Sequence, residues 1–330
     1  MKKILGSATL LFLILIAIGA SKKENSGKTS ESTANTSPTE TSPVNQTGPA
    51  HEAPKDTVSL NNEWENEELI TIEGYSDHVM EIGISADGKY LLFNDNNDPN
   101  KDMHWSIRID DRTYKYMGKV ENTISPTVDG TPSFDNEGNL YFTTLKSYGD
   151  GYKTIYKSGF KDGVAIKPEA VDGNIYVQKN SGKILWISLD PDISNDGKYL
   201  FYSEGMFTLG TDFPNPFNVR GAERVGNTFV KMDDNIFTNV NTSNLEYAPT
   251  ISTNGLELYF SRIDISGSKP KFLGIYVATR SSVNVPFGVP ARIEAISGKV
   301  EAPVLSANEK TLYYHKLDGR VFKAYRVTRK

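Results

Sequence analysis

Five copies of one short phrase run through the chain and constrain what it can fold into. The phrase reads roughly P-x-[IFL]-[SD]-x-[DNE]-G-x-x-L-[YFL]-[FY] and occurs at residues 82–93, 132–142, 191–202, 249–260 and 303–314. Its turn positions follow one another at intervals of 50, 59, 58 and 54 residues; they are Gly88, Gly138, Gly197, Gly255 and Glu309. Such a period indicates a repeat architecture in which each copy belongs to one structural unit.

Each copy is predicted to form two strands joined by a tight turn. A D-G or N-G pair supplies the positive φ that such a turn requires in most copies. The second strand is apolar at consecutive positions, as in Leu91, Leu92 and Phe93, and a strand with two apolar faces is buried on both of them. Sheets stacked radially meet this condition, so the sequence predicts an all-β protein that is a five-bladed β-propeller.

Two further strands are expected to follow each phrase and complete a four-stranded blade. In the third blade we expect them at residues 229–232 and near 237–240. The last blade has room for only three strands before residue 330. We therefore expect an N-terminal strand, at residues 68–73, to pair with the C-terminal blade and close the ring.

The phrase S-A-D-G-K-Y-L-L-F at residues 85–93, with a proline a few residues ahead of it in four copies, resembles the WD40-like (PD40) repeat of TolB-type propellers. The resemblance covers about residues 60–330. It implies a β-propeller, and by analogy with TolB-like proteins it implies a partner in the cell envelope. TolB has six blades, so six remain the alternative to five. Unlike TolB, this sequence has no α/β domain ahead of the repeats.

The N-terminal segment is predicted to direct export. Residues 1–20 combine a basic start (Lys2, Lys3) with an apolar run and a small-residue ending, as in a signal peptide; an uncleaved membrane anchor is the alternative. The ending is lipoprotein-like, but Ser21 stands where a lipidated cysteine would be, which fits either ordinary cleavage after Ala20 or a Cys-to-Ser change.

Residues 21–59 are rich in Ser, Thr and Pro and are expected to form a disordered tether, followed by the propeller at residues 60–330. We therefore expect a protein of the periplasm, cell envelope or extracellular space. Any membrane association would come only through the N-terminal segment.

Composition narrows the classes of function. A net charge of −5 argues against nucleic acid as a partner. The absence of cysteine excludes disulfides, thiolate metal sites and a cysteine nucleophile. The four histidines make no zinc pattern, and neither a G-x-S-x-G motif nor a P-loop is present. The sequence therefore predicts no cofactor and no resident metal.

An acidic residue recurs ahead of every phrase, where the loops of a propeller converge on the mouth of its central channel. The five acids are Asp77, Asp129, Asp190, Glu246 and Glu301. They would be the catalytic residues of a glycoside-hydrolase-like enzyme, or would hold Ca²⁺ or another cation at the channel mouth. The simpler alternative is that they are solvated loop residues.

An insertion at residues 204–228 is expected to lie over the same mouth as a long loop. Its candidate ligand-binding residues mix aromatic rings with guanidinium groups; they are Phe213, Phe217, Arg220 and Arg224. The alternative is that the phenylalanines pack the loop onto its own blade. The three tryptophans, Trp64, Trp105 and Trp186, are expected in the core rather than in a binding platform.

Together these features predict an exported, envelope-associated propeller that binds a protein, peptide or glycan through its loop-rich face without catalysing a reaction. The alternative is a glycoside-hydrolase-like enzyme that uses the carboxylates at the channel mouth. A scaffold without a specific ligand is a third possibility.

Overall fold

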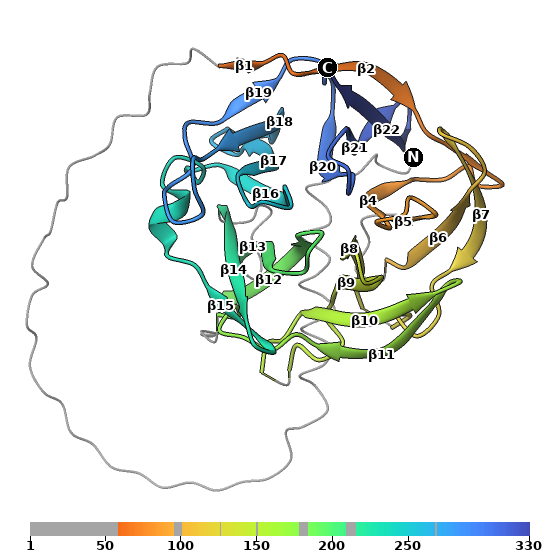
Figure 1. Cartoon of the computed structure of the whole chain (residues 1–330), viewed down its shortest axis with the longest axis horizontal. Coiled ribbons are helices and arrows are strands. Elements are labelled where there is room, and N and C mark those ends of the chain that lie inside the picture. The colour runs from red at the N-terminus through yellow and green to blue at the C-terminus, as the bar shows by residue number, and fades with distance from the viewer. Residues whose placement is uncertain are drawn as a thin grey trace, which may run out of the picture.

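Five small β-sheets surround a central axis, and each sheet is one blade of a propeller (Figure 1). The computed structural model describes residues 59–95, 101–125, 127–149, 151–177, 184–208, 216–267 and 269–330. The predicted signal peptide and all but the last residue of the predicted tether lie outside these ranges. Within them, no helix has the length and apolarity needed to cross a membrane. The predicted five-bladed β-propeller is confirmed, and the six-bladed alternative is wrong.

The strands of each blade follow one another antiparallel from the axis outward. Blade 1 contains β4 (Met80–Ile84), β5 (Tyr90–Asn94), β6 (Met103–Arg108) and β7 (Thr113–Lys119). Blade 2 contains β8 (Asp129–Phe134), β9 (Asn139–Thr144), β10 (Ile155–Lys161) and β11 (Val164–Ala170). Blade 3 contains β12 (Ile184–Ile193), β13 (Tyr199–Thr208), β14 (Phe217–Val225) and β15 (Thr228–Lys231).

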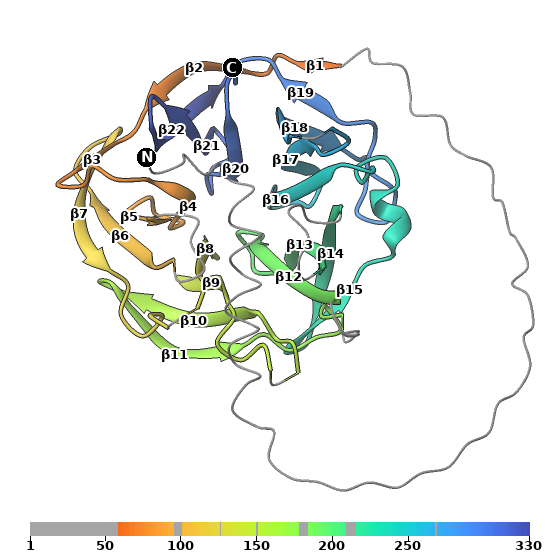
Figure 2. The same cartoon turned by 180° about the vertical axis from the view of Figure 1, so that it is seen from behind.

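The last two blades complete the ring. Blade 4 contains β16 (Leu245–Ile251), β17 (Glu257–Asp264), β18 (Lys271–Thr279) and β19 (Ala291–Ile293), and a 3-10 helix, η2 (Asp234–Phe237), precedes it. Blade 5 contains β20 (Val300–Leu305), β21 (Thr311–Asp318) and β22 (Val321–Arg329). The first strands β4, β8, β12, β16 and β20 line the axis, and each contacts the first strands of both neighbouring blades (Figure 2).

The repeated phrase forms the inner hairpin of every blade. Its second strand is buried on both faces, as predicted: Leu91, Leu92 and Phe93 are each 0% exposed. The turn glycines adopt positive φ, as the sequence predicts, and Glu309 adopts a φ of 58° at the same position of blade 5. We call the end of the channel at these turns the turn end, and the opposite end, where loops lead into the first strands, the mouth end.

Each first strand carries a β-bulge at one fixed place. In blades 2 to 5 the bulge contains the proline of the phrase, which has no N–H to offer to a sheet. The residue before it has positive φ, between 47° and 53°, in all five blades; these residues are Glu81, Thr131, Asp190, Ala248 and Ala302. Positive φ is uncommon for residues other than glycine, so five repetitions show that surrounding contacts impose it.

A hydrogen bond between blades holds each bulged residue. Its backbone N–H donates to a side chain that directly follows the aromatic end of the phrase in the preceding blade, over 2.8 to 3.1 Å. The acceptors, in the order of blades 1 to 5, are Asn94, Thr143, Ser203, Ser261 and His315. The bond from Glu81 N–H to His315 Nδ1, 2.9 Å long, joins the last blade to the first and completes the circle.

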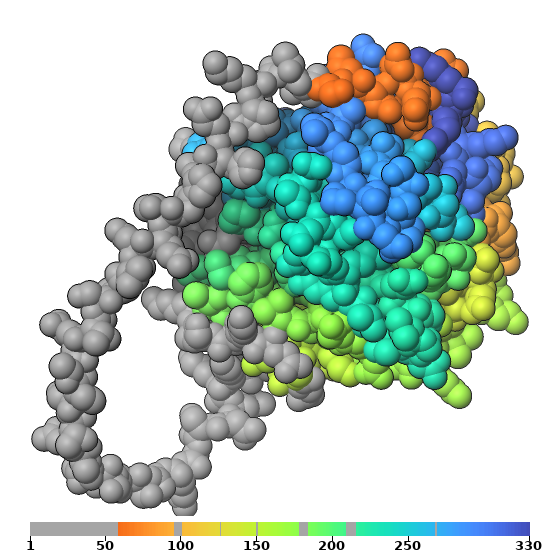
Figure 3. Space-filling view, turned by 60° about the vertical axis from the view of Figure 1, so that its left-hand side comes forward, coloured from red at the N-terminus to blue at the C-terminus, as the bar shows by residue number. Residues whose placement is uncertain are grey.

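Residues 60–73, the strap, add an outer strand to three consecutive blades. β1 (Leu60–Asn61) pairs parallel with β19, β2 (Trp64–Leu69) pairs antiparallel with β22, and β3 (Thr71–Glu73) pairs parallel with β7. Figure 3 shows the strap in orange on the outer surface of the blue blades. Closure by an N-terminal strand is confirmed, but the closing strand is β2 rather than residues 68–73, because Thr71–Glu73 pairs with blade 1.

Blade 3 also differs from its prediction. Residues 204–228 do not form one long loop, because β13 continues to Thr208 and β14 begins at Phe217. The third strand is β14 rather than residues 229–232, and the fourth is β15, whereas η2 overlaps the segment near 237–240 that was expected to be a strand. Phe217, Val219 and Gly221 alternate with polar residues in β14, which is the pattern of a strand.

Substitution of Trp64 tests whether the strap stabilises the whole ring. Its ring is 2% exposed and lies edge-on to Tyr259 at 5.9 Å between centroids. Trp64→Ala should lower the free energy of global unfolding by about 3–5 kcal/mol in urea denaturation. Leu69→Ala in the same strand, where the side chain is 41% exposed, should have an effect of about 0.5 kcal/mol or less. Equal effects, or a loss confined to blade 5, would contradict closure by β2.

Candidate functional site

The five predicted channel acids do not occupy one equivalent level. Asp190 is itself a bulged residue, whereas Glu301 precedes its bulged residue by one position, Asp129 and Glu246 by two, and Asp77 by four. These offsets place the five carboxylates at four different positions relative to the bulge, and the odd offset of Glu301 turns its side chain to the opposite strand face from Asp129 and Glu246. Of the five, only Asp190 lines the pocket at the mouth end of the channel.

Glu246, Glu301 and Asp129 are buried. Glu246 accepts hydrogen bonds from Arg262 Nε at 2.8 Å and from Thr242, and burial still raises its pKa. Glu301 accepts from the Tyr247 hydroxyl at 2.5 Å. Asp129 is 0% exposed, and burial raises its pKa to about 6.

Asp77 and Glu301 lie at opposite extremes of exposure. The side chain of Asp77 is 73% exposed, and its Oδ1 accepts the N–H of His78 at 2.8 Å. Burial alone would raise the pKa of Glu301, but the His315 ring, with Nε2 3.9 Å from Glu301 Oε1, and the hydrogen bond from the Tyr247 hydroxyl hold this pKa below its ordinary value. Asp77 is therefore a solvated group, whereas Glu301 is an internal one.

A charged cluster at the mouth end joins blades 1 and 3. The Lys101 ammonium contacts Glu81 Oε2, and Lys101 is 2% exposed. Asp190 faces the same pocket, and its Oδ2 accepts from the Ser203 hydroxyl at 2.9 Å. Burial, reinforced by the charge of Glu81, raises the pKa of Asp190 to about 7, although Lys101 opposes the shift.

Glu81 is not among the five acids predicted from loop position. The bulged residue directly precedes the first residue of each phrase. When the five phrases are aligned on this residue, Glu81 and Asp190 are the two acids at equivalent positions. Blade 1 has Ile82 where the other four phrases begin with proline, so the equivalence of Glu81 and Asp190 is hard to see in the sequence. Lys101 has no repeat counterpart that would have marked it.

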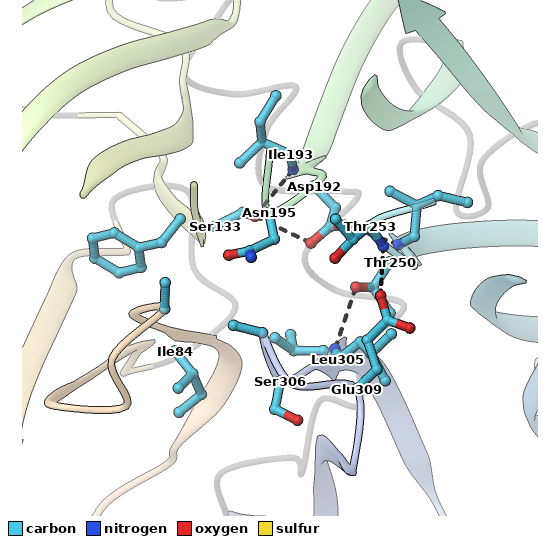
Figure 4. A pocket seen from close by; sticks show the side chains of 15 residues that line it. Ile84, Ser133, Asp192, Ile193, Asn195, Thr250, Thr253, Leu305, Ser306 and Glu309 are labelled. Atoms are coloured by element: carbon cyan, nitrogen blue, oxygen red, sulfur yellow. Dashed lines mark hydrogen bonds between the residues drawn. The ribbon is translucent and has the colours of Figure 1, made fainter. Parts of the chain in front are cut away.

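A second pocket opens at the turn end (Figure 4). Asp192, two residues after Asp190, accepts from Ser133 Oγ of blade 2 at 3.1 Å and from Ile251 N–H of blade 4 at 2.9 Å. Burial raises its pKa to about 7. Glu309 lines the same pocket and accepts from the Thr253 N–H at 2.7 Å. Both ends of the channel therefore carry carboxyl groups, which are held by the bulges and turns that recur in every blade.

Three of the four candidate ligand-binding residues lie on β14, and each has a partner within the fold. Phe213 is outside the described residues. Phe217 is 3% exposed and meets Phe207 edge-on, with 5.2 Å between ring centroids. Arg220 Nε donates to Glu204 at 2.9 Å. Arg224 donates to the Tyr141 hydroxyl at 2.7 Å. Phe217 thus packs against its own blade, and a ligand-binding role for the set stays a prediction.

One tryptophan is not in the core. Trp64 and Trp105 are buried, as expected, whereas Trp186 is partly exposed. It lies opposite Met206 in the β12–β13 pairing, and Met206 is also partly exposed. The sequence gives no sign that one tryptophan differs from the others. Among the residues described, no three or more His, Asp or Glu side chains form a group that could hold a metal ion.

Raising the pH from 5 to 8 should lower the free energy of unfolding. Asp190 and Asp192 have pKa values of about 7 in the folded protein, against about 3.9 for an unfolded aspartate. Folding therefore takes up protons between these values, and its free energy becomes less favourable as the pH rises towards 7.

Urea denaturation at each pH measures this slope. Asp192→Asn should flatten it, and the exposed substitution Asp77→Asn should leave it unchanged. Stability that increases from pH 5 to 8 would contradict the assignment.

Comparison with known proteins supports the fold alone. No protein-family model and no curated protein matches the sequence. Among solved structures, the native arabinanase of Bacillus subtilis aligns with a TM-score of 0.53 and 13% identity, over 81% of this chain and 95% of the arabinanase. An endo-arabinase from Bacteroides thetaiotaomicron aligns with a TM-score of 0.50 and 17% identity, over 80% and 98%. TolB from Acinetobacter baumannii aligns with a TM-score of 0.40 and 13% identity; 76% of this chain matches 55% of TolB.

Proposed function

We propose that this protein is an exported, envelope-associated propeller that binds a protein, peptide or glycan through its loop-rich face, at the mouth end, without catalysing a reaction. The signal-like residues 1–20 and the tether-like residues 21–59 support export and attachment at a distance from a membrane. The geometry of blade 3 supports the position of the binding surface.

The observation that carries this proposal is the extension of blade 3 beyond the other blades. Six residues of β12 precede its bulged residue Asp190, whereas between one and three residues do so in β4, β8, β16 and β20. At about 3.3 Å per residue, the extra three to five residues lengthen the strand by roughly 10–16 Å. β13 continues alongside to Thr208. One blade therefore projects past its neighbours at the mouth end.

Both neighbouring blades support this projection. Phe207 and Phe217 are buried in a cluster that includes Tyr148, from the region after β9, and Ile263 of β17. The Tyr148 hydroxyl also donates to the Trp186 carbonyl oxygen at 2.8 Å. A hairpin packed in this way holds its shape before a ligand arrives, which reduces the entropy lost on binding.

The opposite face of the projection presents the contact surface. Side chains alternate along a strand, so Trp186 and Met206 point away from the buried Phe207. Both are partly exposed. Tryptophan and methionine are enriched in protein interfaces, and tryptophan supplies a large rigid surface for a peptide or a sugar ring.

Substitutions on this face test the proposal. The double variant Trp186→Ala/Met206→Ala should weaken binding at least tenfold, because it removes the central contact area. Binding can be measured against immobilised cell-wall glycans and purified envelope proteins by surface plasmon resonance. Met117→Ala, an apolar residue 45% exposed on β7, is the matched control and should bind like the wild type. Equal affinity of all three proteins would contradict the proposal.

Hydrolysis remains a second candidate because of one observation. Glu81 and Asp190 face one pocket, and burial holds the pKa of Asp190 near 7, where it can carry a proton at neutral pH. A protonated acid beside a second carboxyl group is the arrangement that glycoside hydrolysis uses. In this candidate Asp190 would act as the general acid and Glu81 as its carboxylate partner, and the other four acids predicted from the sequence would have no catalytic part.

Release of reducing sugar from a panel of cell-wall polysaccharides distinguishes the two candidates. The binding proposal expects no release by the wild-type protein. A hydrolase should release sugar, and Asp190→Asn and Glu81→Gln should each lower that rate by roughly 100-fold or more. The exposed substitution Glu137→Gln should not change it. Sugar release that survives both channel substitutions would exclude this pair as the catalytic groups.

A further inference from the structure

The pocket at the turn end has no part in the proposed function, which uses the mouth end. It has a volume of about 420 Å³, including its open side, and all five blades contribute to its lining. Figure 4 shows Asp192 and Glu309 among the side chains that line this pocket, from blades 3 and 5. The bulge and the turns fix the backbone at both positions, so the site is formed in advance.

Two acidic side chains line this pocket. Asp192 is 7% exposed and Glu309 is partly exposed. None of the fifteen lining residues is lysine, arginine or histidine. The other polar groups are hydroxyls and an amide, including Thr250, Ser306 and Asn195. Glu309 and the ionised form of Asp192 attract a cation in this partly enclosed site, because low local polarisability strengthens the attraction.

Glu309 is where this blade departs from the repeat. The other four copies have glycine at this position, and an L-residue with a φ of 58° is strained relative to glycine. The side chain accepts the Thr253 N–H at 2.7 Å. That hydrogen bond needs only an oxygen, which glutamine would also supply, so it leaves the negative charge unexplained. The charge adds a second carboxylate to a pocket that already contains Asp192.

The cation that fits is organic. No three or more His, Asp or Glu residues in the described ranges form a group that could hold a metal ion. Apolar side chains, among them Ile84, Phe134 and Leu305, make up the rest of the wall. An ammonium group matches the acceptors, and a hydrocarbon chain matches the apolar wall.

We propose that the turn-end pocket binds a small organic cation, a primary ammonium group on a short aliphatic chain. The ammonium lies between Asp192 and Glu309, and the chain lies against Ile84 and Leu305. This site is separate from the binding surface of blade 3, so either can fail without the other.

Titration calorimetry with the full chain tests the site. The probe is 1,4-diaminobutane, and 1,4-butanediol is the uncharged control of the same length. The diamine should bind to one saturable site, and the diol should bind at least tenfold more weakly. Glu309→Gln should weaken diamine binding at least tenfold while the melting temperature stays unchanged.

Glu309→Gly serves as a second variant because it restores the residue of the other four copies and relieves the positive φ. It should lose diamine binding to the same degree and melt at the same temperature or higher. Glu137→Gln removes an exposed acid from the corresponding turn of blade 2 and should bind like the wild type. The proposal would be overturned if the wild type bound no diamine, or bound diamine and diol equally. It would also be overturned if stoichiometric Ca²⁺ displaced the diamine, or if both Glu309 variants bound it as well as the wild type does.

Discussion

The whole ring depends on one hydrogen bond made five times. In every blade, the N–H of a bulged residue on the innermost strand donates to a side chain of the preceding blade. These groups are buried or partly buried, so a missing partner would leave a backbone donor without water or protein to bond; the penalty is about 1–3 kcal/mol. The bond also explains the positive φ, because that conformation turns the amide towards the neighbouring blade. Proline can follow the bulged residue since it has no N–H to satisfy.

This frame fixes the backbone around the channel and leaves the side chains free to vary. The bulged residues include two acids, a threonine and two alanines. The charged cluster of Glu81, Lys101 and Asp190 at the mouth end is one product of that freedom, and Asp192 and Glu309 at the turn end are another. The projection of blade 3 is a third departure from regularity. The functions proposed above therefore rest on the places where the repeat is broken.

Much of the fold was predictable because its signal repeats. The apolar second strand recurs five times and the turn glycine four times, at similar spacing, which identifies the blades and their number. Outer strands such as β3 (Thr71–Glu73) are short and half exposed, so their sequences barely differ from loops. Apolar and polar residues alternate in β14 as expected for a strand, but this strand lies within residues 204–228, which were predicted to be an inserted loop.

The candidate site was less predictable for a geometric reason. Counting acids ahead of each phrase mixes residues on opposite faces of a strand, since a shift of one position reverses the side chain. Alignment on the bulge shows that Glu81 and Asp190 occupy equivalent positions. The sequence alone does not show that the proline of the phrase lies in a bulge, so this alignment could not be made from it. The exposure of Trp186 depends on how far one blade projects, and Lys101 reaches the channel from a segment outside the repeat. No local pattern encodes either feature.

The closing bond between blade 5 and blade 1 gives the most direct measurement of this account. His315 can be replaced by Asn, which offers an acceptor at the same position as Asn94 does in blade 1, or by Leu, which has similar size and no acceptor. We expect the free energy of unfolding of His315→Leu in urea denaturation to be about 1–3 kcal/mol lower than that of His315→Asn, with all five blades lost in one transition. Equal stability of the two variants would contradict the claim that these hydrogen bonds between blades hold the ring together.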